Sequence, residues 1–430
     1  MASFLNDIKS MGLSKILIIA FGFATSVITA RYLGPEKNGI IASLLVYPGL
    51  FMSIGSLGIR QSTAYFLGKN LFTESQIKTA ISQIWFLTSI VSLIVCFLLM
   101  RYLSHSGENL LLVILALVPI PFSLFNTYNS GIFLGKNQIS IFNKINWIPT
   151  LILLSLTLIF VVWFSFDIPG YMTAMIGGPM FISVILLFKN KFIKSFSLSF
   201  DWKIIKSMLS LGMVYAISLL VINLNYKLDV VLLDYLSVPF ETGIYTKGSN
   251  ITQYLWQIPM LFSTIVFARS AVAKKDREFS FKITQLLRIS IPVIAIGSIL
   301  LVLFSEFIII KFYGEAFRGS INVLNILIPG VLLLTVYKVM NMDLAGKGKP
   351  WISMKAMLPS LLINIILNII FIPEYGAAGA SFASTVSYSI AAILFLHFYS
   401  KEVQIPIKTI LRYKKGDFEP IFQILRKFKN

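Results

Sequence analysis

The chain has 430 residues, of which 57% are hydrophobic and 13% are charged, and its formal net charge is +19. A soluble domain with an interior core does not combine so many apolar side chains with so few charges, so we expect a protein whose solvent is lipid. Most cations stand beside apolar stretches, where they fix topology and meet anionic headgroups, so nucleic acid is not expected as a partner.

Between Ser14 and Tyr399 the sequence alternates long apolar stretches with short polar breaks. Each stretch holds 18 or more mainly apolar residues, and roughly 20 are needed to carry a helix across a hydrocarbon layer about 30 Å thick. We therefore predict an all-α polytopic membrane protein with about twelve transmembrane helices. The predicted spans are 14–33, 40–67, 79–103, 109–134, 139–166, 168–188, 207–236, 244–272, 283–312, 321–344, 351–372 and 377–399.

Lys and Arg residues are concentrated in every second break. Of the 37 in the chain, 28 lie in the N-terminus, in the breaks near 68–78, 135–144, 189–206, 269–288 and 345–355, and in the tail after residue 400. The alternate breaks hold six, and three lie inside spans. Because cytoplasmic loops carry the excess of Lys and Arg, we predict that both termini are cytoplasmic. The first apolar run is of span length and lacks a small-residue cleavage site, so we expect this helix to be retained.

An internal repeat is visible at a shift of 210 residues. Without gaps, Arg101, Pro119 and Pro149 coincide with Lys311, Pro329 and Pro359, each at the same place relative to its span. Two six-helix lobes of the same orientation, with a cavity between them, are therefore predicted as a parallel pseudo-repeat. The predicted domains are an N-terminal lobe (1–188), a basic cytoplasmic linker (189–206), a C-terminal lobe (207–400) and a basic cytoplasmic tail (401–430).

The end of the tail combines apolar and basic residues at helical spacing. The apolar positions are Phe418, Ile421, Phe422, Leu425 and Phe428, and the neighbouring cations are Arg426, Lys427 and Lys429. This pattern is typical of an interfacial helix that binds anionic membrane lipids. A solvated tail that only enforces topology accounts for it equally well.

Ionisable residues inside the spans are the candidates for function, because each costs at least about 2.5 to 3.5 kcal/mol at a helix centre. By depth, four cations form a series from the outer face to the inner one: Arg31, Lys227, Arg60 and Lys338. We predict that they form a cationic, substrate-binding cavity. Arg suits bidentate contact with phosphate, and Lys acts as a point charge.

These four cations are not equally strong candidates for substrate binding. Arg31 and Lys338 lie toward span ends, where snorkelling to water or headgroups is the favoured interpretation. Arg60 lies about 10 Å of helix rise from the end of its span, and Lys227 lies in the outer half of the seventh span. Neither reaches water easily, so we predict Arg60 and Lys227 as the main functional pair.

The seventh span carries two polar stripes, because Asn223 shares a helix face with Lys227 and Asn225 shares one with Asp229. Together with Asp343, these acidic and amide residues are candidates for charge partners or for ion coupling. A structural salt bridge explains Asp229 as well as a transport role does. Coupling to H⁺, to Na⁺ or to the membrane potential therefore stays open, and no cofactor is expected.

The sequence contains no pattern that predicts a metal site. The two histidines, His105 and His397, lie far apart, and the chain has no HExxH, CxxC or carboxylate cluster. Its single cysteine, Cys96, lies inside an apolar stretch, so a disulfide within the chain is impossible and a packing role is expected.

Three segments resemble a known family. They are Tyr32 to Gly39 followed by Leu57-Gly58-Ile59, the stretch from Asp229 through Gly243-Ile244-Tyr245 to Pro259, and Gly346 to Lys349 followed by NIILNIIFIPEYGAAGA from Asn364 to Ala380. These segments are similar to the bacterial polysaccharide-biosynthesis flippases, the Wzx-like members of the multidrug/oligosaccharidyl-lipid/polysaccharide exporter superfamily. The resemblance covers nearly the whole chain up to about residue 400.

The resemblance implies a transporter rather than an enzyme. Such a flippase would move an undecaprenyl-pyrophosphate-linked oligosaccharide from the cytoplasmic to the outer leaflet by alternating access, for cell-surface polysaccharide export. It would reside in the bacterial inner membrane, where a glycan polymerase or glycosyltransferases would be its partners. On this interpretation Arg60 and Lys227 would attract the pyrophosphate and sugar carboxylates.

A cation-coupled multidrug exporter of the same superfamily is the nearest alternative. Such an exporter would usually need a carboxylate deep in the N-terminal half, and the first six predicted spans contain none. A major-facilitator carrier is disfavoured because its Asp- and Arg-rich motif is missing from the second break. The short outer breaks disfavour a glycan polymerase or ligase, and also a scaffold or receptor.

Overall fold

The computed structural model describes residues 2–136, 138–196, 201–271 and 276–419. Nine helices in this part of the chain are long and apolar enough to cross a membrane. The α-helices are α1 (Ala2–Gly55), α2 (Ile59–Gly68), α3 (Glu74–Leu103), α4 (Leu110–Leu117), α5 (Pro119–Gly135), α6 (Ile139–Ile145), α7 (Ile148–Thr157), α8 (Asp167–Lys189), α9 (Trp202–Leu236), α10 (Pro239–Gln253), α11 (Gln257–Ala271), α12 (Asp276–Leu303), α13 (Ser305–Ile308), α14 (Gly319–Gly346), α15 (Trp351–Val403) and α16 (Ile407–Leu411). Short 3₁₀ or π turns are η1 (His105–Glu108), η2 (Leu158–Trp163), η3 (Phe192–Ser195), η4 (Tyr254–Trp256), η5 (Ile309–Tyr313), η6 (Glu315–Phe317) and η7 (Lys415–Phe418).

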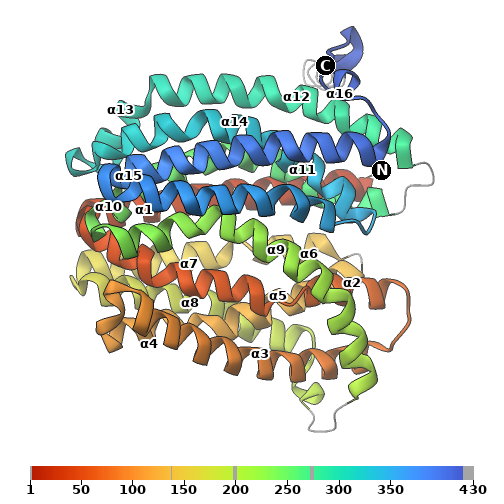
Figure 1. The fold of residues 1–430 in the computed structure, drawn as a ribbon. Coiled ribbons are helices and arrows are strands. Elements are labelled where there is room, and N and C mark those ends of the chain that lie inside the picture. Colours follow the sequence, from red (N-terminus) through yellow and green to blue (C-terminus); the bar gives the residue numbers. More distant parts are fainter. Residues whose placement is uncertain (1, 137, 197–200, 272–275, 420–430) are drawn as a thin grey trace.

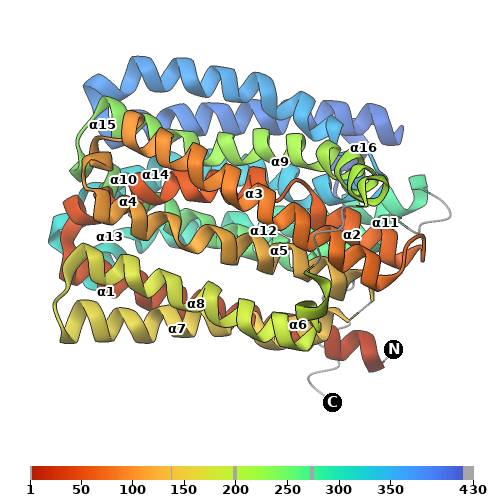
Figure 2. The same ribbon diagram turned by 90° about the horizontal axis from the view of Figure 1, so that it is seen from below.

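The long helices share one direction and form two groups. Figure 1 shows α2 to α8 on one side and α11 to α15 on the other, and the turned view keeps the common helix direction (Figure 2). Helix α1 packs against α3 and α7 in the first group and against α9 and α10. Helix α9 packs against α15 as well as against α2. Helices α1 and α9 therefore connect the two groups.

The two longest helices are each bent at a glycine. Gly34 in α1 has φ 71°, and Gly376 in α15 has φ 51°, conformations that a side chain would strain. Polar side chains satisfy backbone groups that each bend frees. Asn38 donates to the carbonyls of Thr29 and Gly34, at 2.8 and 2.6 Å, and the Glu241 carboxylate accepts the Ala377 N–H at 2.8 Å. Each of these helices thus consists of two arms.

The second predicted span is interrupted rather than continuous. Leu57 and Gly58 have φ of 43° and 60°, and α2 begins only at Ile59. A Cβ at Gly58 would overlap the backbone of Gly212 in α9, so the break allows two chain segments to approach closely. The eighth predicted span is likewise divided, by η4 between α10 and α11.

Apolar side chains face both the interior and the surroundings of the bundle. Buried clusters lie among α9, α12, α14 and α15, and among α1, α3, α4 and α8. The outward face of α12 exposes Val293, Ile296, Ile299, Leu300 and Leu303, at helical spacing. Such a continuous exposed apolar face is what a lipid-facing helix requires.

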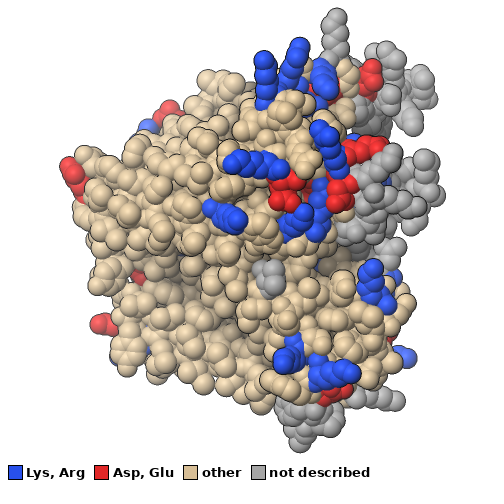
Figure 3. All heavy atoms as spheres, turned by 45° about the vertical axis from the view of Figure 1, so that its right-hand side comes forward, with Lys and Arg blue, Asp and Glu red and all other residues tan. Residues whose placement is uncertain are grey.

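One end of the molecule is strongly basic. The described chain starts and stops at this end, and Lys and Arg side chains gather on it in the space-filling view (Figure 3). The breaks predicted to be rich in Lys and Arg are therefore on one side of the bundle. We call this side the basic end and the opposite side the distal end.

The start of the tail is docked on α12. The Arg288 guanidinium donates to both oxygens of Asp417, at 2.7 and 2.9 Å, and to the backbone carbonyls of Thr409 and Ile410. This hydrogen bonding by Arg288 holds the pKa of the Asp417 carboxyl below its ordinary value. Residues 404–418 are thus anchored. The predicted interfacial positions Ile421, Phe422, Leu425 and Phe428, with Arg426, Lys427 and Lys429, lie outside the described residues.

Candidate functional site

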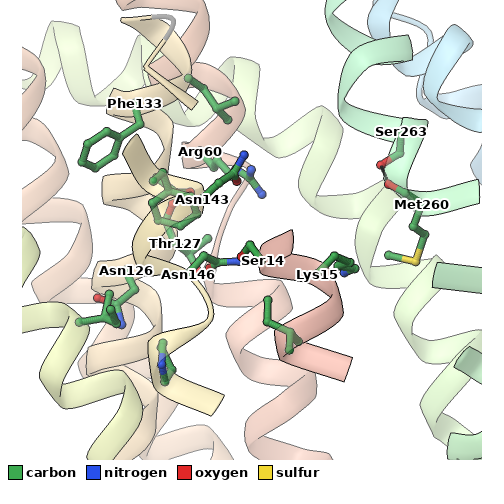
Figure 4. A pocket seen from close by; sticks show the side chains of 16 residues that line it. Ser14, Lys15, Arg60, Asn126, Thr127, Phe133, Asn143, Asn146, Met260 and Ser263 are labelled. Carbon is green, nitrogen blue, oxygen red and sulfur yellow. Dashed lines mark hydrogen bonds between the residues drawn. The ribbon is translucent and has the colours of Figure 1, made fainter. Parts of the chain in front are cut away.

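A polar cavity of about 470 Å³ lies between the start of α1 and helices α2, α5, α6 and α7, with α11 across from them (Figure 4). Its lining residues are Ser14, Lys15, Ile18, Arg60, Asn126, Thr127, Ser130, Phe133, Leu134, Phe142, Asn143, Asn146, Pro149, Ile182, Met260 and Ser263. Several of them are close in sequence to the Lys- and Arg-rich breaks, so the cavity lies toward the basic end. Two of the lining residues are cations, and none of them is acidic.

Arg60 is the predicted residue that lines this cavity. It occupies the first turn of α2, directly after the break at Gly58. Its Nε is buried and has no hydrogen-bond partner, and Arg60 forms no ion pair with the described residues. In Figure 4 its guanidinium lies beside Asn143, whose Nδ2 also lacks a partner. Among the described residues no carboxylate pairs with Arg60, so its guanidinium can bind an anionic ligand.

Lys15 is the second cation of the cavity, and the sequence-based prediction missed it. It lies in the first arm of α1, and it forms no hydrogen bond or ion pair with the described residues. The sequence-based prediction counted Lys15 only among the cations of the basic N-terminus. Its position one residue inside the first predicted span, at the basic end, was the signal that could have placed it beside Arg60.

Lys227 does not line this cavity. Its amine is directed at α1, where a Cβ on Gly49 would come within 3.0 Å of Nζ. Lys227 forms no hydrogen bond or ion pair with the described residues. The structure therefore separates Arg60 and Lys227, and it places Lys227 on the seam between α1 and α9.

Lys338 also lies away from the cavity. Its Nζ is 3.9 Å from the ring centroid of Tyr226 and 4.4 Å from that of Trp256. These rings contact each other and Tyr388 at centroid distances of 5.8 Å. Snorkelling does not describe this residue, because aromatic faces inside the bundle replace water as the partner of the amine.

Arg31 closes the distal end instead of joining a cavity. It lies in α1 and donates from Nε to the carbonyl of Phe312 at 2.8 Å, and from Nη2 to the carbonyls of Ile310 and Lys311. These carbonyls end the π turn η5, where backbone dipoles favour a cation. The contact joins the first and second halves of the chain.

Further contacts between α1 and α10 reinforce this closure. Lys247 donates to the carbonyl and hydroxyl of Ser26 and to the Thr29 hydroxyl, at 2.9 to 3.2 Å. A Cβ on Gly39 would overlap the Pro239 carbonyl, and one on Gly243 would overlap that of Pro35. We call the contacts of Arg31, Lys247, Gly39 and Gly243 the distal closure. The distal closure is tight, and the polar cavity lies toward the basic end. The structure therefore has the geometry of a transporter that is closed at its distal end.

Asp229 is fully buried between α9, α10 and α15. Its oxygens accept hydrogen bonds from Tyr245 at 2.7 Å, from the amides of Asn364 and Asn368 at 2.9 and 2.8 Å, and from Ser384. The described residues place no cation beside it. The amide oxygens of Asn364 and Asn368 are buried without a partner. A salt bridge from Asp229 to another helix, which the sequence left open as an explanation, is therefore not found among the described residues.

The remaining predicted residues take structural positions. Asn225 donates to Ser360 and Ser387 at 3.1 Å, and Asn223 donates to the Leu219 carbonyl at 2.8 Å. Asp343 forms an ion pair with Lys347 at 3.1 Å. It also accepts hydrogen bonds from Ser270, Ser280 and Tyr399 at 2.5 to 2.7 Å. Asp343 thus ties α11, α12, α14 and α15 together at the basic end.

Comparison with known proteins identifies the family. The family model described as "Polysaccharide biosynthesis protein" matches residues 4–268, which is more than half of the chain. The chain therefore belongs to this family, and the resemblance predicted from its sequence is confirmed.

Two relatives in archaea are similar over different lengths. The chain is 28% identical to the probable low-salt glycan biosynthesis flippase Agl15 of Haloferax volcanii over 189 residues, which cover 41% of this chain and 38% of that protein. It is 26% identical to the uncharacterized membrane protein MJ1375 of Methanocaldococcus jannaschii over 410 residues, covering 90% of this chain and 93% of that protein.

Solved structures share the fold. The lipid II flippase MurJ, in an inward closed conformation, superposes with a TM-score of 0.74 at 17% identity and covers 96% of this chain and 95% of its own. An inward-facing MATE family transporter of the MOP superfamily gives a TM-score of 0.71 at 14% identity, covering 91% and 98%. By name, Agl15, MurJ and the MATE protein are flippases or transporters, not enzymes.

Proposed function

We propose that the protein is a flippase that moves a lipid-linked oligosaccharide, carried on undecaprenyl pyrophosphate, from the cytoplasmic to the outer leaflet. The observation that carries this proposal is the cavity lined by Arg60 and Lys15, with no acidic residue among those that line it. Membership of the polysaccharide biosynthesis family and the similarity to a glycan flippase support the choice of cargo. Cell-surface polysaccharide export, together with glycosyltransferases and a glycan polymerase, is the pathway that fits such a cargo.

The topology we propose has twelve membrane crossings in two six-helix lobes. The bends at Gly34 and Gly376 divide α1 and α15 into two crossings each, and α10 with α11 supplies one more. The lobes are residues 1–188 and 207–400, joined by the linker 189–206 and followed by the tail 401–430. The contacts of Gly39 with Pro239 and of Gly243 with Pro35 are reciprocal, and both the two glycines and the two prolines are 204 residues apart, which supports a parallel repeat. Both termini, at the basic end, would be cytoplasmic.

The chemistry of the cavity fits the head of this cargo. A guanidinium without a protein counter-ion can donate two parallel hydrogen bonds to a phosphate, and an unpaired ammonium adds a point charge. Amide and hydroxyl groups such as those of Asn143 and Thr127 suit sugar hydroxyls. A volume of about 470 Å³ lies within the roughly 300–1,000 Å³ range of small-ligand sites. It fits the pyrophosphate and adjoining sugar, while the lipid chain stays in the bilayer.

Substitution of Arg60 tests the cargo-binding role. Loss of a hydrogen bond to a charged group costs about 1.5–3 kcal/mol, so we expect Arg60→Ala to slow flipping of undecaprenyl-pyrophosphate glycan in proteoliposomes by about 10- to 100-fold. Arg60→Lys should keep part of the activity, because Lys keeps the positive charge but lacks the two parallel N–H donors of the guanidinium. Arg318→Ala is the matched control, since Arg318 is an exposed distal cation paired with Glu306 and Glu315. Equal flipping by wild type, Arg60→Ala and the control would contradict the proposal.

Asp229 is the residue we propose for energy coupling, with H⁺ or Na⁺ as the ion. It is preferred over Asp343 because Asp343 already has Lys347 as its cation. Rotation of the Asn364 and Asn368 amides would turn their unpartnered oxygens toward a cation held by the carboxylate. Asn223 and Asn225, bonded elsewhere, would support α9 rather than bind the ion.

Removal of the Asp229 charge tests this coupling. In Asp229→Asn vesicles we expect flipping to lose its dependence on an imposed Na⁺ or pH gradient, because the carboxylate that binds the ion is gone. Asp167→Asn is the control, since that carboxylate is half-buried and already pairs with a cation, Lys37, at 2.5 Å. A gradient dependence that persists in Asp229→Asn would place coupling at another site or in the membrane potential.

The multidrug exporter alternative is less well supported. The similarity to MATE transporters is a similarity of fold at 14% identity. The cavity has no lining carboxylate, and its two cations form no ion pair with the described residues, so it repels a cationic drug.

A further inference from the structure

Asp234 is a buried carboxylate that the proposed transport cycle does not use. It lies in α9, two residues before the end of this helix, and is 2% exposed. Neither of its oxygens has a hydrogen-bond partner among the described residues. Buried polar groups are almost always paired, and an unpaired buried charge is costly. Asp234 therefore requires a compensating group.

Two further unpaired oxygens face Asp234 from α1. Ser43 and Tyr47 are one helical turn apart on the same face of this helix, 0% and 3% exposed, and neither hydroxyl has a hydrogen-bond partner. The Ser43 hydroxyl lies close enough to Asp234 to act on its carboxylate as a hydrogen-bonding group, and Tyr47 interacts with it through charge, but neither hydroxyl forms a hydrogen bond of normal geometry with it. The three side chains thus lie near one another, and none of them has a hydrogen-bond partner of normal geometry among the described residues.

The end of α3 contributes the remaining polar groups. The Ser104 hydroxyl and the backbone and imidazole of His105 also act on Asp234. His105 is exposed and forms no ion pair with Asp234 within 4.0 Å, so the carboxylate is not neutralised from this side. The oxygens therefore come from three elements: α1, α9 and the turn after α3.

Asp229, another buried carboxylate of α9, differs from Asp234 in its hydrogen bonding. Both carboxylates are buried in α9, five residues apart. Asp229 accepts four hydrogen bonds from neutral donors, whereas no described group forms a hydrogen bond of normal geometry with Asp234. The sequence explains the difference in direction, since five residues turn a helix by about 140° and point the two side chains to different neighbours.

We propose that Asp234, Ser43, Tyr47 and Ser104 bind a small monovalent cation, with Na⁺ as the best fit, between α1 and α9. The donor set consists of oxygens, which suit hard cations. A single carboxylate balances one positive charge, whereas Ca²⁺ takes six to eight oxygens and usually several carboxylates. The site joins α1 to α9 near the distal closure. Cation binding therefore stabilises the state in which the distal end is shut.

Sodium binding to the purified full chain in detergent tests the site. NaCl is titrated against choline chloride at constant ionic strength, and the rise in Tm is followed without any glycan, so the result is independent of the proposed cargo. In this titration all variants carry Asp229→Asn, which removes the other candidate ion site. We expect this background to keep a sodium-dependent rise in Tm and the Asp229→Asn/Asp234→Asn double variant to lose it. Tyr47→Phe, which removes one hydroxyl, should raise the sodium concentration at half effect about tenfold.

Two controls decide the outcome. Asp167→Asn removes a half-buried carboxylate that is already paired with Lys37, and should leave the sodium dependence unchanged. Equilibrium binding of radioactive sodium to the single variant Asp234→Asn should fall by one ion per chain relative to wild type. An equal sodium-dependent rise in the double variant, or no sodium dependence in the Asp229→Asn background, would overturn the proposal.

Discussion

At the scale of single residues, the three cations predicted inside the spans have three different surroundings. Arg60 lines a polar cavity, Lys227 lies against the backbone of Gly49, and Lys338 lies on the rings of Tyr226 and Trp256. None of them forms an ion pair with the described residues. Only the first arrangement leaves donors directed into a space that a ligand can enter. Positive charge in a span is thus insufficient to identify a binding residue.

The aromatic partners of Lys338 lead to a double-mutant prediction. Desolvated cation–π contacts are worth about 2 kcal/mol, and removal of the amine also removes the cost of burying it. We therefore expect Trp256→Leu to destabilise the wild type by about 1–2 kcal/mol more than it destabilises Lys338→Met. Thermal and denaturant unfolding of the four proteins in one detergent gives this coupling energy. Equal effects of Trp256→Leu in both backgrounds would show that the rings only pack there.

The same residues show where sequence reasoning reaches its limit. Hydropathy located Arg60, Lys227 and Lys338 in spans, because an ionisable group stands out in an apolar run. It could not assign their neighbours, since the rotation of each helix depends on packing against others. Trp256, which contacts Lys338, is 82 residues away along the chain. Asp234 was overlooked for a related reason, because it stands at the end of its span, where acidic residues are ordinarily solvated.

At the scale of elements, the bend of α1 determines the distal closure. The helix turns at Gly34, and the residues after the bend cross the start of α10 so closely that Gly39 touches the backbone of Pro239. The sequence predicted a break between the spans 14–33 and 40–67. The backbone is non-helical at Gly34, so two helical arms meet there at an angle, and Asn38 satisfies carbonyls that the bend frees.

A methyl group at Gly39 should loosen this closure. In Gly39→Ala the new Cβ would overlap the Pro239 carbonyl, so α1 and α10 must move apart. We expect a cysteine at position 26, next to Lys247, to react with maleimide several-fold faster in Gly39→Ala, in a background where Cys96→Ser removes the single native cysteine.

Gly22→Ala is the matched control on the same helix. A Cβ at Gly22 meets only a methyl group of Thr150, at the ordinary contact distance of 3.9 Å, so labelling at position 26 should not change. If Gly39→Ala and Gly22→Ala gave the same rate as the parent, the distal closure would not depend on the contact between these backbones.

At the scale of the whole molecule, the charge distribution and hydropathy of the sequence predicted the membrane fold and its basic end, but the types of side chain did not predict where the cavity lies. The membrane fold and the gathering of cations at one end follow from long-range regularities that any packing must respect. The position of the cavity does not, because it arises where the first arm of α1, α5 and α11 fail to meet. Lys15 belongs to this cavity for that reason, although its sequence context is that of a basic terminus.

The asymmetry between the two ends leads to a prediction about orientation. If the basic end is cytoplasmic, a cysteine at position 263 in the cavity is accessible from the cytoplasm, whereas one at position 26 is sealed by the distal closure. A membrane-impermeant maleimide should therefore label position 263 in inside-out vesicles and leave position 26 unlabelled in right-side-out vesicles. Alternating access requires this pattern to reverse when the cargo is translocated, so undecaprenyl-pyrophosphate glycan should raise labelling at position 26 and lower it at position 263. Labelling of position 263 only from the outside would contradict the orientation. Labelling of both positions from one side in every condition would contradict the mechanism, because a bundle that opens at only one end cannot carry a headgroup across.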